Sequence, residues 1–316
     1  MNYIQMSILF TLEYFSLFDY PLTCQEIFNW LFDISQIDKA LVQKDRLIDV
    51  GITDINDQLV ELVRQKKIEY KDGYYFLPCR CNIIETREKK KAVSLRKIKK
   101  ARIIAKLLRF IPGLKMIAIC SNLGYFNADE NADIDFFIVT KDDRIWTVRF
   151  WSTFFMKILR QRPINGKTRN KICLSYFVAQ NSLNLERTRV ANPDTHLIYL
   201  LSQYLPIYTE DGAWGKYIEC NKWINKYLPN FRYLASAKKY IIKPRFLWLK
   251  RVIGATITSC EENFYRKIQM AIMPDVLQSA ARKDDRNVII SDSILKLHIN
   301  DKRSKYNKKI IGRFKI

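Results

Sequence analysis

Residues 116–140 read MIAICSNLGYFNADENADIDFFIVT, and this stretch decides the fold. The apolar run at 116–119 predicts a buried strand, and CSNLG at 120–124 predicts a tight turn. A polar loop at 127–131 then leads to a second strand, expected at 132–139. Two strands joined by a turn and a short loop indicate a small sheet.

Asp133 and Asp135 are the candidate catalytic residues and metal ligands of this stretch. Side chains two apart in a strand share a face, so the two carboxylates lie side by side while Ile134 and Phe136 point into the core. The carboxylates repel each other unless a cation lies between them, and Mg²⁺ prefers oxygen ligands that it shares with substrate phosphates. The pattern predicts a site for Mg²⁺ or Mn²⁺ with a nucleoside triphosphate. The alternative is a turn or capping pair.

The turn before the second strand has residue types that suit phosphate binding. Ser121 offers a hydroxyl and a backbone N–H, Asn122 adds an amide, and Gly124 allows close approach of the backbone. We therefore expect Ser121, Asn122 and Gly124 to bind the nucleotide.

The strand, the turn and the D-x-D strand resemble the signature of the nucleotidyltransferase superfamily, in which a Gly-Ser turn precedes D-x-D. Ser121 and Asp133 are twelve residues apart, a spacing typical of that signature. The resemblance implies transfer of a nucleotidyl group from an NTP, with ATP as the expected nucleotide, to an acceptor hydroxyl or amine. It also implies that Asp133 and Asp135 ligate the metal and that Ser121 contacts phosphate.

The narrower likeness is to a prokaryotic group of nucleotidyltransferase-domain proteins, and it covers most of the chain. In that group D-x-D and an apolar I-V-T run are followed by a basic helix containing Trp. Here these are residues 133–140 and RIWTVR at 144–149. Further matches are FDYPL at 18–22, KDGYYF at 71–76, NKW at 221–223 with LPN at 228–230, and LH at 297–298 with Asp301.

Two features depart from that pattern. Cys120 stands where the turn begins with glycine, and a Cβ with a thiol there would crowd the phosphate or restrain the turn. Active members carry a third carboxylate on a later strand, but the strand expected at 171–179 (KICLSYFVA) has none and offers only Ser175. A catalytically inactive nucleotide- or RNA-binding regulatory protein on the same fold is therefore the alternative function.

A basic loop lies between a strongly apolar helix expected at 142–159 and the strand at 171–179. Lys167 and Arg169 lie in this loop, and both could neutralise phosphate charge beside the sheet. The alternative is a solvent-exposed loop without a ligand.

Residues 1–80 predict a winged-helix-like domain. Helices are expected at 4–18, from Cys24 to Phe32 behind a Thr23–Glu26 capping box, from Ser35 to Leu41, and at 54–65, before a hairpin at Asp72-Gly73. The candidate recognition helix exposes acidic Asp54, Asp57 and Glu61, which repel phosphates. We therefore expect no duplex DNA binding through residues 1–80 and favour an interaction role.

Residues 83–109 predict one long helix with eleven Lys or Arg and two Glu. Its basic face is either a surface for RNA or another polyanion, or a solvated linker helix. A further helix is expected at 195–204, and another at 221–228.

Residues 236–316 are expected to be mostly helical as far as Ser279. Residues 240–257 resemble an interfacial amphipathic helix, with core packing as the alternative. A strand and turn at 287–297 lead to His298, Asp301 and Arg303, which form either a polar cluster for the site or a structural group. The last residues, 302–316, are very basic and predict a loose tail.

Composition limits the class of protein. The chain has 316 residues, 48% hydrophobic, and a formal net charge of +22, which divides into −4 over residues 1–80, +14 over 81–235 and +12 over 236–316. No signal peptide and no membrane span are expected, and the seven scattered cysteines predict a reduced, cytoplasmic protein without a structural zinc site.

The sequence as a whole predicts an α+β fold with a small mixed sheet of nucleotidyltransferase type flanked by helices. The expected parts are a winged-helix-like domain at 1–80, a nucleotidyltransferase-like domain with a leading basic helix at 81–235, and a helical basic region at 236–316. A third hypothesis is an interaction module built on the acidic N-terminal domain. The acceptor, the base preference and the oligomeric state do not follow from the sequence.

Overall fold

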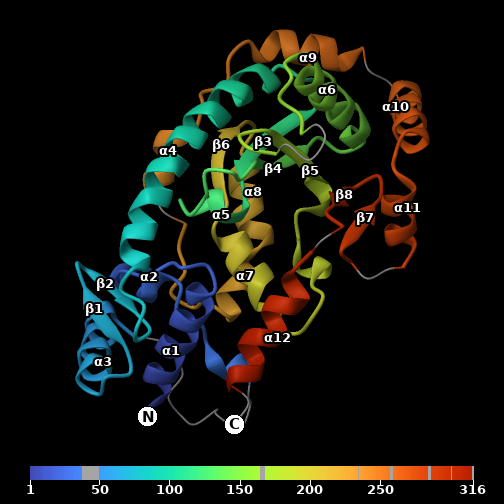
Figure 1. The fold of residues 1–316 in the computed structure, drawn as a ribbon. Coiled ribbons are helices and arrows are strands. Elements are labelled where there is room, and N and C mark those ends of the chain that lie inside the picture. The colour runs from blue at the N-terminus through green and yellow to red at the C-terminus, as the bar shows by residue number, and fades with distance from the viewer. Residues whose placement is uncertain are drawn as a thin grey trace.

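A computed structural model describes residues 1–37, 50–163, 168–233, 235–256, 259–283, 286–299 and 301–314. Its central strands are β3 (Leu114–Ile119), β4 (Ile134–Thr140), β5 (Ile172–Ala179), β6 (Leu205–Thr209), β7 (Val288–Ile290) and β8 (Ile294–Leu297). They form one sheet of order β6–β3–β4–β5–β8–β7, in which the β4–β5 pair is parallel and the other pairs are antiparallel (Figure 1). The expected α+β class with a mixed sheet is confirmed.

Helices surround this sheet, and the long α4 runs along one side of the molecule (Figure 1). In chain order the α-helices of the described residues are α1 (Tyr3–Ser16), α2 (Cys24–Asn29), α3 (Ile52–Arg64), α4 (Ile83–Leu108), α5 (Ser121–Gly124), α6 (Ile145–Ile158), α7 (Thr195–Ser202), α8 (Ala213–Cys220), α9 (Leu247–Ala255), α10 (Ser259–Ala271), α11 (Asp275–Arg282) and α12 (Arg303–Phe314). None of them is long and apolar enough to cross a membrane.

The two faces of the sheet belong to different apolar clusters. On β4, Ile134 and Phe136 pack in the cluster that contains residues of α4 and α6. Phe137 and Val139 belong to the opposite cluster, with residues of α1, α7 and α8. Successive side chains of a strand alternate between faces, so Asp135 opens onto the face of α1 and α7. The sequence prediction that Ile134 and Phe136 point into the core is confirmed, with exposures of 0% and 1%.

The N-terminal elements follow the expected order of helices and hairpin. The Thr23–Glu26 capping box is present at the start of α2, and β1 (Glu69–Lys71) pairs with β2 (Tyr74–Phe76) across Asp72-Gly73. Glu26 also accepts two hydrogen bonds from the buried Arg87 of α4, at 2.8 and 2.7 Å. This ion pair fixes the start of α4 to the N-terminal helices. Of the helix expected from Ser35 to Leu41, the described residues show a 3-10 helix at Ile34–Gln36, and the remainder of the prediction falls in residues 38–49, outside the described part.

Several other expectations need correction. No strand was expected at 205–209, but these residues form edge strand β6. The helix expected at 221–228 is a 3-10 helix at Lys222–Lys226, which follows α8. The expected loose tail is instead helix α12, which packs against α1 and α7. Its apolar Ile310 is fully buried, and Phe314 packs on Phe10 with ring centroids 5.1 Å apart. Basic residues on the other faces of α12 obscured the helical periodicity of its apolar residues in the sequence.

Candidate functional site

The carboxylates of Asp133 and Asp135 line one cavity of about 320 Å³ at the start of β4. Burial, with repulsion from Asp135, raises the pKa of Asp133 to about 6. Burial also raises the pKa of Asp135, against hydrogen bonds from the Cys173 and Ser121 side chains. Each carboxylate is therefore harder to ionise than a solvated one, and a cation placed between them would relieve both effects.

The turn beside β4 places Ser121 and Asn122 in the same cavity. Ser121 has φ +57°, a left-handed backbone that is strained for a residue with a Cβ. Cys120 has φ −123° and ψ −171°, an extended backbone that any residue adopts. The backbone at position 120 therefore does not require glycine. The strained left-handed conformation is at Ser121, one residue later. Its buried amide donates to the Asp135 carbonyl at 3.1 Å, which holds the turn against β4.

Residues from the far end of the sequence complete the cavity. His298 and Asp301 follow β8, Arg303 begins α12, and all three line it. Ser175 on β5 bonds to His298, with 2.6 Å between Oγ and Nε2. His298, Asp301 and Arg303, the expected polar cluster, therefore lie near the D-x-D strand β4. They do so because β8 pairs with β5, and β5 pairs with β4.

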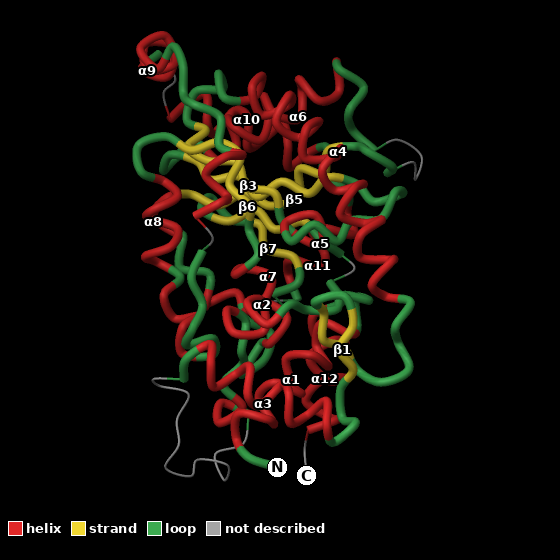
Figure 2. The backbone as a smooth tube through the Cα atoms, turned by 90° about the vertical axis from the view of Figure 1, so that its left-hand side faces the viewer, coloured by secondary structure: helices red, strands yellow, loops and turns green. Residues whose placement is uncertain are grey.

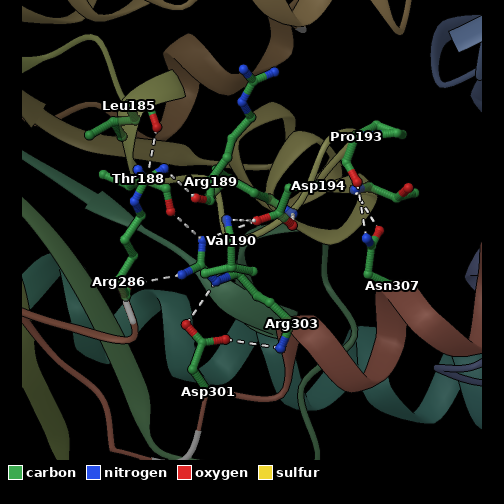
Figure 3. A network of polar contacts seen from close by, with 12 residues as sticks. Leu185, Thr188, Arg189, Val190, Pro193, Asp194, Arg286, Asp301, Arg303 and Asn307 are labelled. Carbon is green, nitrogen blue, oxygen red and sulfur yellow. Dashed lines mark hydrogen bonds and ion pairs between the residues drawn. The ribbon is translucent and has the colours of Figure 1, made fainter. Parts of the chain in front are cut away.

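Arg303 is held in a network that ties α12 to the start of α7 (Figure 3). Its guanidinium lies 2.7 Å from Asp301 and 3.3 Å from Asp194, and it donates to the Thr188 carbonyl at 2.9 Å. Only 3% of its surface is exposed. Arg303 thus positions the cavity wall, and its charge is compensated by Asp301 and Asp194.

Lys296 is the basic group of the cavity that sequence reasoning missed. It is 6% exposed and lies 2.6 Å from Asp301. Burial and the charge of Arg303, against the attraction of Asp301, lower the pKa of Lys296 to about 8. For Asp301, burial raises the pKa, but Arg303 and Lys296 outweigh it and hold the pKa at about 2. The available signal was a lysine in β8 two residues before His298, a spacing that places both side chains on one side of an extended chain.

An aromatic wall was also missed. Phe18 stacks on His196 with ring centroids 5.8 Å apart, and Tyr306 lies 5.1 Å from Phe18 and 4.9 Å from His196. All three line the cavity, and Tyr14 bonds to His196 at 2.8 Å. These residues come from α1, α7 and α12, which no local sequence pattern connects.

Asp135, Cys173 and His298 form the one group of three acidic, cysteine or histidine residues, within the described part of the chain, whose ligand atoms all lie within 4.8 Å of one another. Asp135 faces Cys173 directly in the β4–β5 register. The other two donors of this group are a thiol and an imidazole, and neither Asp133 nor any further carboxylate of the described residues belongs to it. Carboxylates suit Mg²⁺ or Mn²⁺, whereas a mixed oxygen, sulfur and nitrogen set suits Zn²⁺.

The remaining predicted site residues lie elsewhere. Gly124 borders a neighbouring cavity, and a Cβ on it would lie 2.4 Å from the Gln203 carbonyl oxygen, which explains glycine by packing. Arg169 is exposed and pairs with Glu130 at 2.8 Å. Lys167 lies outside the described residues.

A buried lysine holds the loop that carries Asp133. Lys97 of α4 donates to the carbonyls of Glu130 and Ala132 at 3.0 and 2.7 Å, and to Asn170 Oδ1 at 2.6 Å. Burial lowers the pKa of Lys97, against the attraction of Glu130. The basic helix therefore supports the site from behind rather than entering the cavity.

Comparison of the chain with protein-family models, with curated proteins and with solved structures found no match.

Proposed function

We propose that the cavity beside Asp133 and Asp135 binds a nucleoside triphosphate with a divalent cation and transfers its nucleotidyl group to an acceptor. The carrying observation is that two carboxylates of raised pKa share one cavity with Ser121, with Lys296 and with an aromatic wall. A volume of about 320 Å³ lies in the range of small-molecule sites. The parts of a nucleotide correspond to these features one by one.

In this proposal Asp133 and Asp135 hold the cation, which would neutralise phosphate charge and polarise the phosphorus that is attacked. Ser121 and Asn122 contact phosphate oxygens from the turn. Lys296 and Lys302, both in the cavity lining, add positive charge. The base lies against Phe18, His196 and Tyr306, whose rings offer flat apolar surface.

One observation favours a second candidate, a non-catalytic nucleotide-binding protein. Among the described residues no close group of three ligands joins a third carboxylate to Asp133 and Asp135, although Asp301 lines the same cavity, and the close donors beside Asp135 are Cys173 and His298. The two candidates share the binding step and differ only in turnover, so binding and transfer must be measured separately.

The binding test is thermal unfolding of the full chain with ATP, with Mg²⁺ or Mn²⁺, and with both. A ligand at about 100 times its Kd stabilises the folded state by about 2.7 kcal/mol, which raises Tm by several degrees. Asp135→Asn should abolish the shift without lowering Tm of the free protein, because it removes one of two repelling charges. The matched control is Asp129→Asn, an exposed carboxylate on the neighbouring loop paired with Lys90.

Absence of any metal-dependent ATP binding at millimolar concentration would contradict both candidates. Equal destabilisation of Asp135→Asn with and without ligand, with binding intact, would show that the carboxylate pair is architectural. Transfer is tested by incubating labelled NTPs with cell extract and the protein, with the Asp133→Ala/Asp135→Ala variant as control. Binding without labelled product identifies the non-catalytic candidate.

A further inference from the structure

One end of the molecule exposes large apolar side chains from three different helices. Trp248 of α9 is 66% exposed and Ile158 of α6 is 62% exposed. Leu107 and Phe110, at the end of α4, are 48% and 40% exposed. We call this surface the apolar end. It lies beyond the sheet, on the side away from α1 and α12 (Figures 1 and 2).

A hollow in the apolar end joins the three helices into one surface. It has a volume of about 520 Å³, and its lining includes Leu107 and Phe110 beside Phe155, Ile158 and Ile253. None of the side chains that line it is charged. Soluble chains rarely leave a contiguous apolar surface from several elements uncovered, so this one indicates a partner.

The chain segments that form the apolar end are rich in basic residues, although Asp211 pairs with Arg251 at 3.6 Å and the neighbouring α10 carries Glu261 and Glu262. Residues 99–109, 144–163 and 243–256, which contain these helices, carry fourteen Lys or Arg and no Asp or Glu. Lys250 is buried against Glu210 at 2.8 Å, but Lys106, Lys157 and Arg245 are exposed. An apolar surface bordered by exposed cations matches the boundary of a bilayer with anionic headgroups.

The same charges disfavour two other partners. A two-fold contact between copies of this chain would bring one basic surface against its own copy, and like charges repel. A nucleic acid would satisfy the cations, but aliphatic Ile158, Leu107 and Val252 gain nothing from phosphates. A lipid surface offers acyl chains to the apolar side chains and phosphates to the cations. Since none of the described helices spans a membrane, contact with a bilayer would be peripheral.

We propose that the apolar end docks this protein onto anionic membrane surfaces. Trp248, Ile158 and Phe155 enter the boundary between headgroups and acyl chains, and Lys157, Arg160 and Arg245 contact lipid phosphates. The cavity of Asp133 and Asp135 is lined in part by Tyr14 of α1, His196 of α7 and Tyr306 of α12, and none of its lining residues belongs to α6 or α9. The inference rests on surface residues alone and does not depend on the proposed function.

The test is flotation of the full chain with vesicles of phosphatidylcholine alone or with added phosphatidylglycerol. Wild type should bind only the anionic vesicles, and less at high salt. Trp248→Ser/Ile158→Ser should weaken binding at least about tenfold, because two inserted side chains are lost. The matched control is Val60→Ser/Tyr70→Ser, which changes two side chains exposed by 59% and 56% on α3 and β1.

The charge contribution is measured separately. Each cation near an anionic surface contributes about 1 kcal/mol, so Lys157→Gln/Arg160→Gln should weaken binding by about 30-fold. Lys222→Gln/Lys226→Gln, which removes two exposed lysines distant from the apolar end in sequence, should have little effect. All of these side chains are exposed, so the thermal melts should match wild type and exclude unfolding as the cause.

Three results would overturn the proposal. The first is a wild type that binds neither kind of vesicle, or both equally. The second is a dimer that light scattering detects and Trp248→Ser/Ile158→Ser dissolves, without vesicle binding, which would make a second copy the partner. The third is RNA binding lost in the same variant, again without vesicle binding.

Discussion

His196 is the residue whose ionisation the fold opposes most clearly. It stacks on Phe18, bonds to Tyr14 at 2.8 Å, and feels the charges of Asp301 and Arg303. Burial lowers its pKa from 6.5 to about 4, since Asp301 only partly compensates. A buried neutral histidine must become charged in acid, so the fold loses stability there.

We predict that this loss begins below the unfolded pKa of 6.5 and is complete near the folded pKa of about 4. Above pH 6.5 the histidine is neutral in both states and contributes no pH dependence. The shift corresponds to at most about 3 kcal/mol, reduced by the partial solvent contact of His196. Urea unfolding of wild type and His196→Gln across this pH range measures it. Parallel curves for the two proteins would contradict a neutral His196.

Glycine is required at position 124 because backbone atoms of other segments lie close to it, and not because of its φ and ψ angles. A Cβ there would meet the Gln203 carbonyl at 2.4 Å and the Ile119 carbonyl at 3.3 Å. We predict that Gly124→Ala lowers the free energy of unfolding by about 1–3 kcal/mol, because backbone atoms cannot yield as a flexible side chain does.

The matched control is Gly215→Ala in the first turn of α8, where a Cβ meets nothing within 4 Å. Alanine should stabilise this helix by about 0.5–1 kcal/mol. Chemical denaturation of both variants compares them directly. A neutral Gly124→Ala would show that α5 and the segment after α7 can separate at no cost.

At the scale of elements, the sequence predicted the strands and turns whose signal lies within a short stretch of residues. The D-x-D strand and the hairpin at Asp72-Gly73 have local signals, an alternation and a turn, and both are present. Strand β6 was missed because Pro206 lacks an N–H and argues against a strand. It is tolerated because β6 is the edge of the sheet, where one side needs no donor.

Helix α12 shows the reverse error. Tyr306, Ile310 and Phe314 recur every four residues, which is helical spacing, but the surrounding lysines suggested a disordered tail. Asp194, more than a hundred residues earlier in the sequence, forms an ion pair with Arg303 at the start of this basic helix. The same distance explains why Lys296 and His196 were missed in the site, whereas Asp133 and Ser121 lie in one local motif.

Asp194 connects α7 to α12, and its removal should be costly. It is fully buried, caps α7 by accepting from the Leu197 amide at 3.0 Å, and lies 3.3 Å from Arg303. We predict that Asp194→Ala costs about 3–5 kcal/mol, because Arg303 loses one of its two carboxylate partners in a buried site. Asp194→Asn, which keeps a capping oxygen, should cost less.

The control for Asp194 is an exposed ion pair. Glu219 and Lys222 are 68% and 65% exposed and lie 2.6 Å apart. Glu219→Ala should cost less than about 1 kcal/mol. Urea unfolding at neutral pH ranks the three variants, and equal costs for Asp194→Ala and Glu219→Ala would refute a structural role for the buried pair.

At the scale of the whole molecule, the first and last helices meet around the candidate site. Tyr14 and Phe18 come from the α1 region and Tyr306 from α12, and all three line the cavity of Asp133. The ends of the described chain accordingly lie at the same end of the molecule (Figure 2). A ligand in this cavity contacts both termini, so its binding should stabilise the N-terminal helices and α12 together.

The charge distribution separates the N-terminal elements from the rest. Residues 1–80 carry a net charge of −4, and the remainder of the chain carries the excess of basic residues. On α3 the exposed side chains include Asp54 and Asp57, and Arg64 is engaged by Glu61 at 2.7 Å. An element with this surface repels phosphates, whereas the exposed face of α4 attracts them.

We therefore predict that any binding of the intact chain to duplex DNA arises from α4 and not from α3. Neutralising Lys99 and Lys106, both exposed on α4, removes two phosphate contacts. The slope of log K against log salt should then become shallower by about 2, since each contact contributes about 0.9. Arg64→Gln, the matched loss of one cation from α3, should leave affinity and slope unchanged because its guanidinium already neutralises Glu61. Fluorescence anisotropy of labelled duplex across a salt series decides the matter. A weaker affinity in Arg64→Gln, with Lys99→Gln/Lys106→Gln unchanged, would make α3 a recognition helix in spite of its acidic surface.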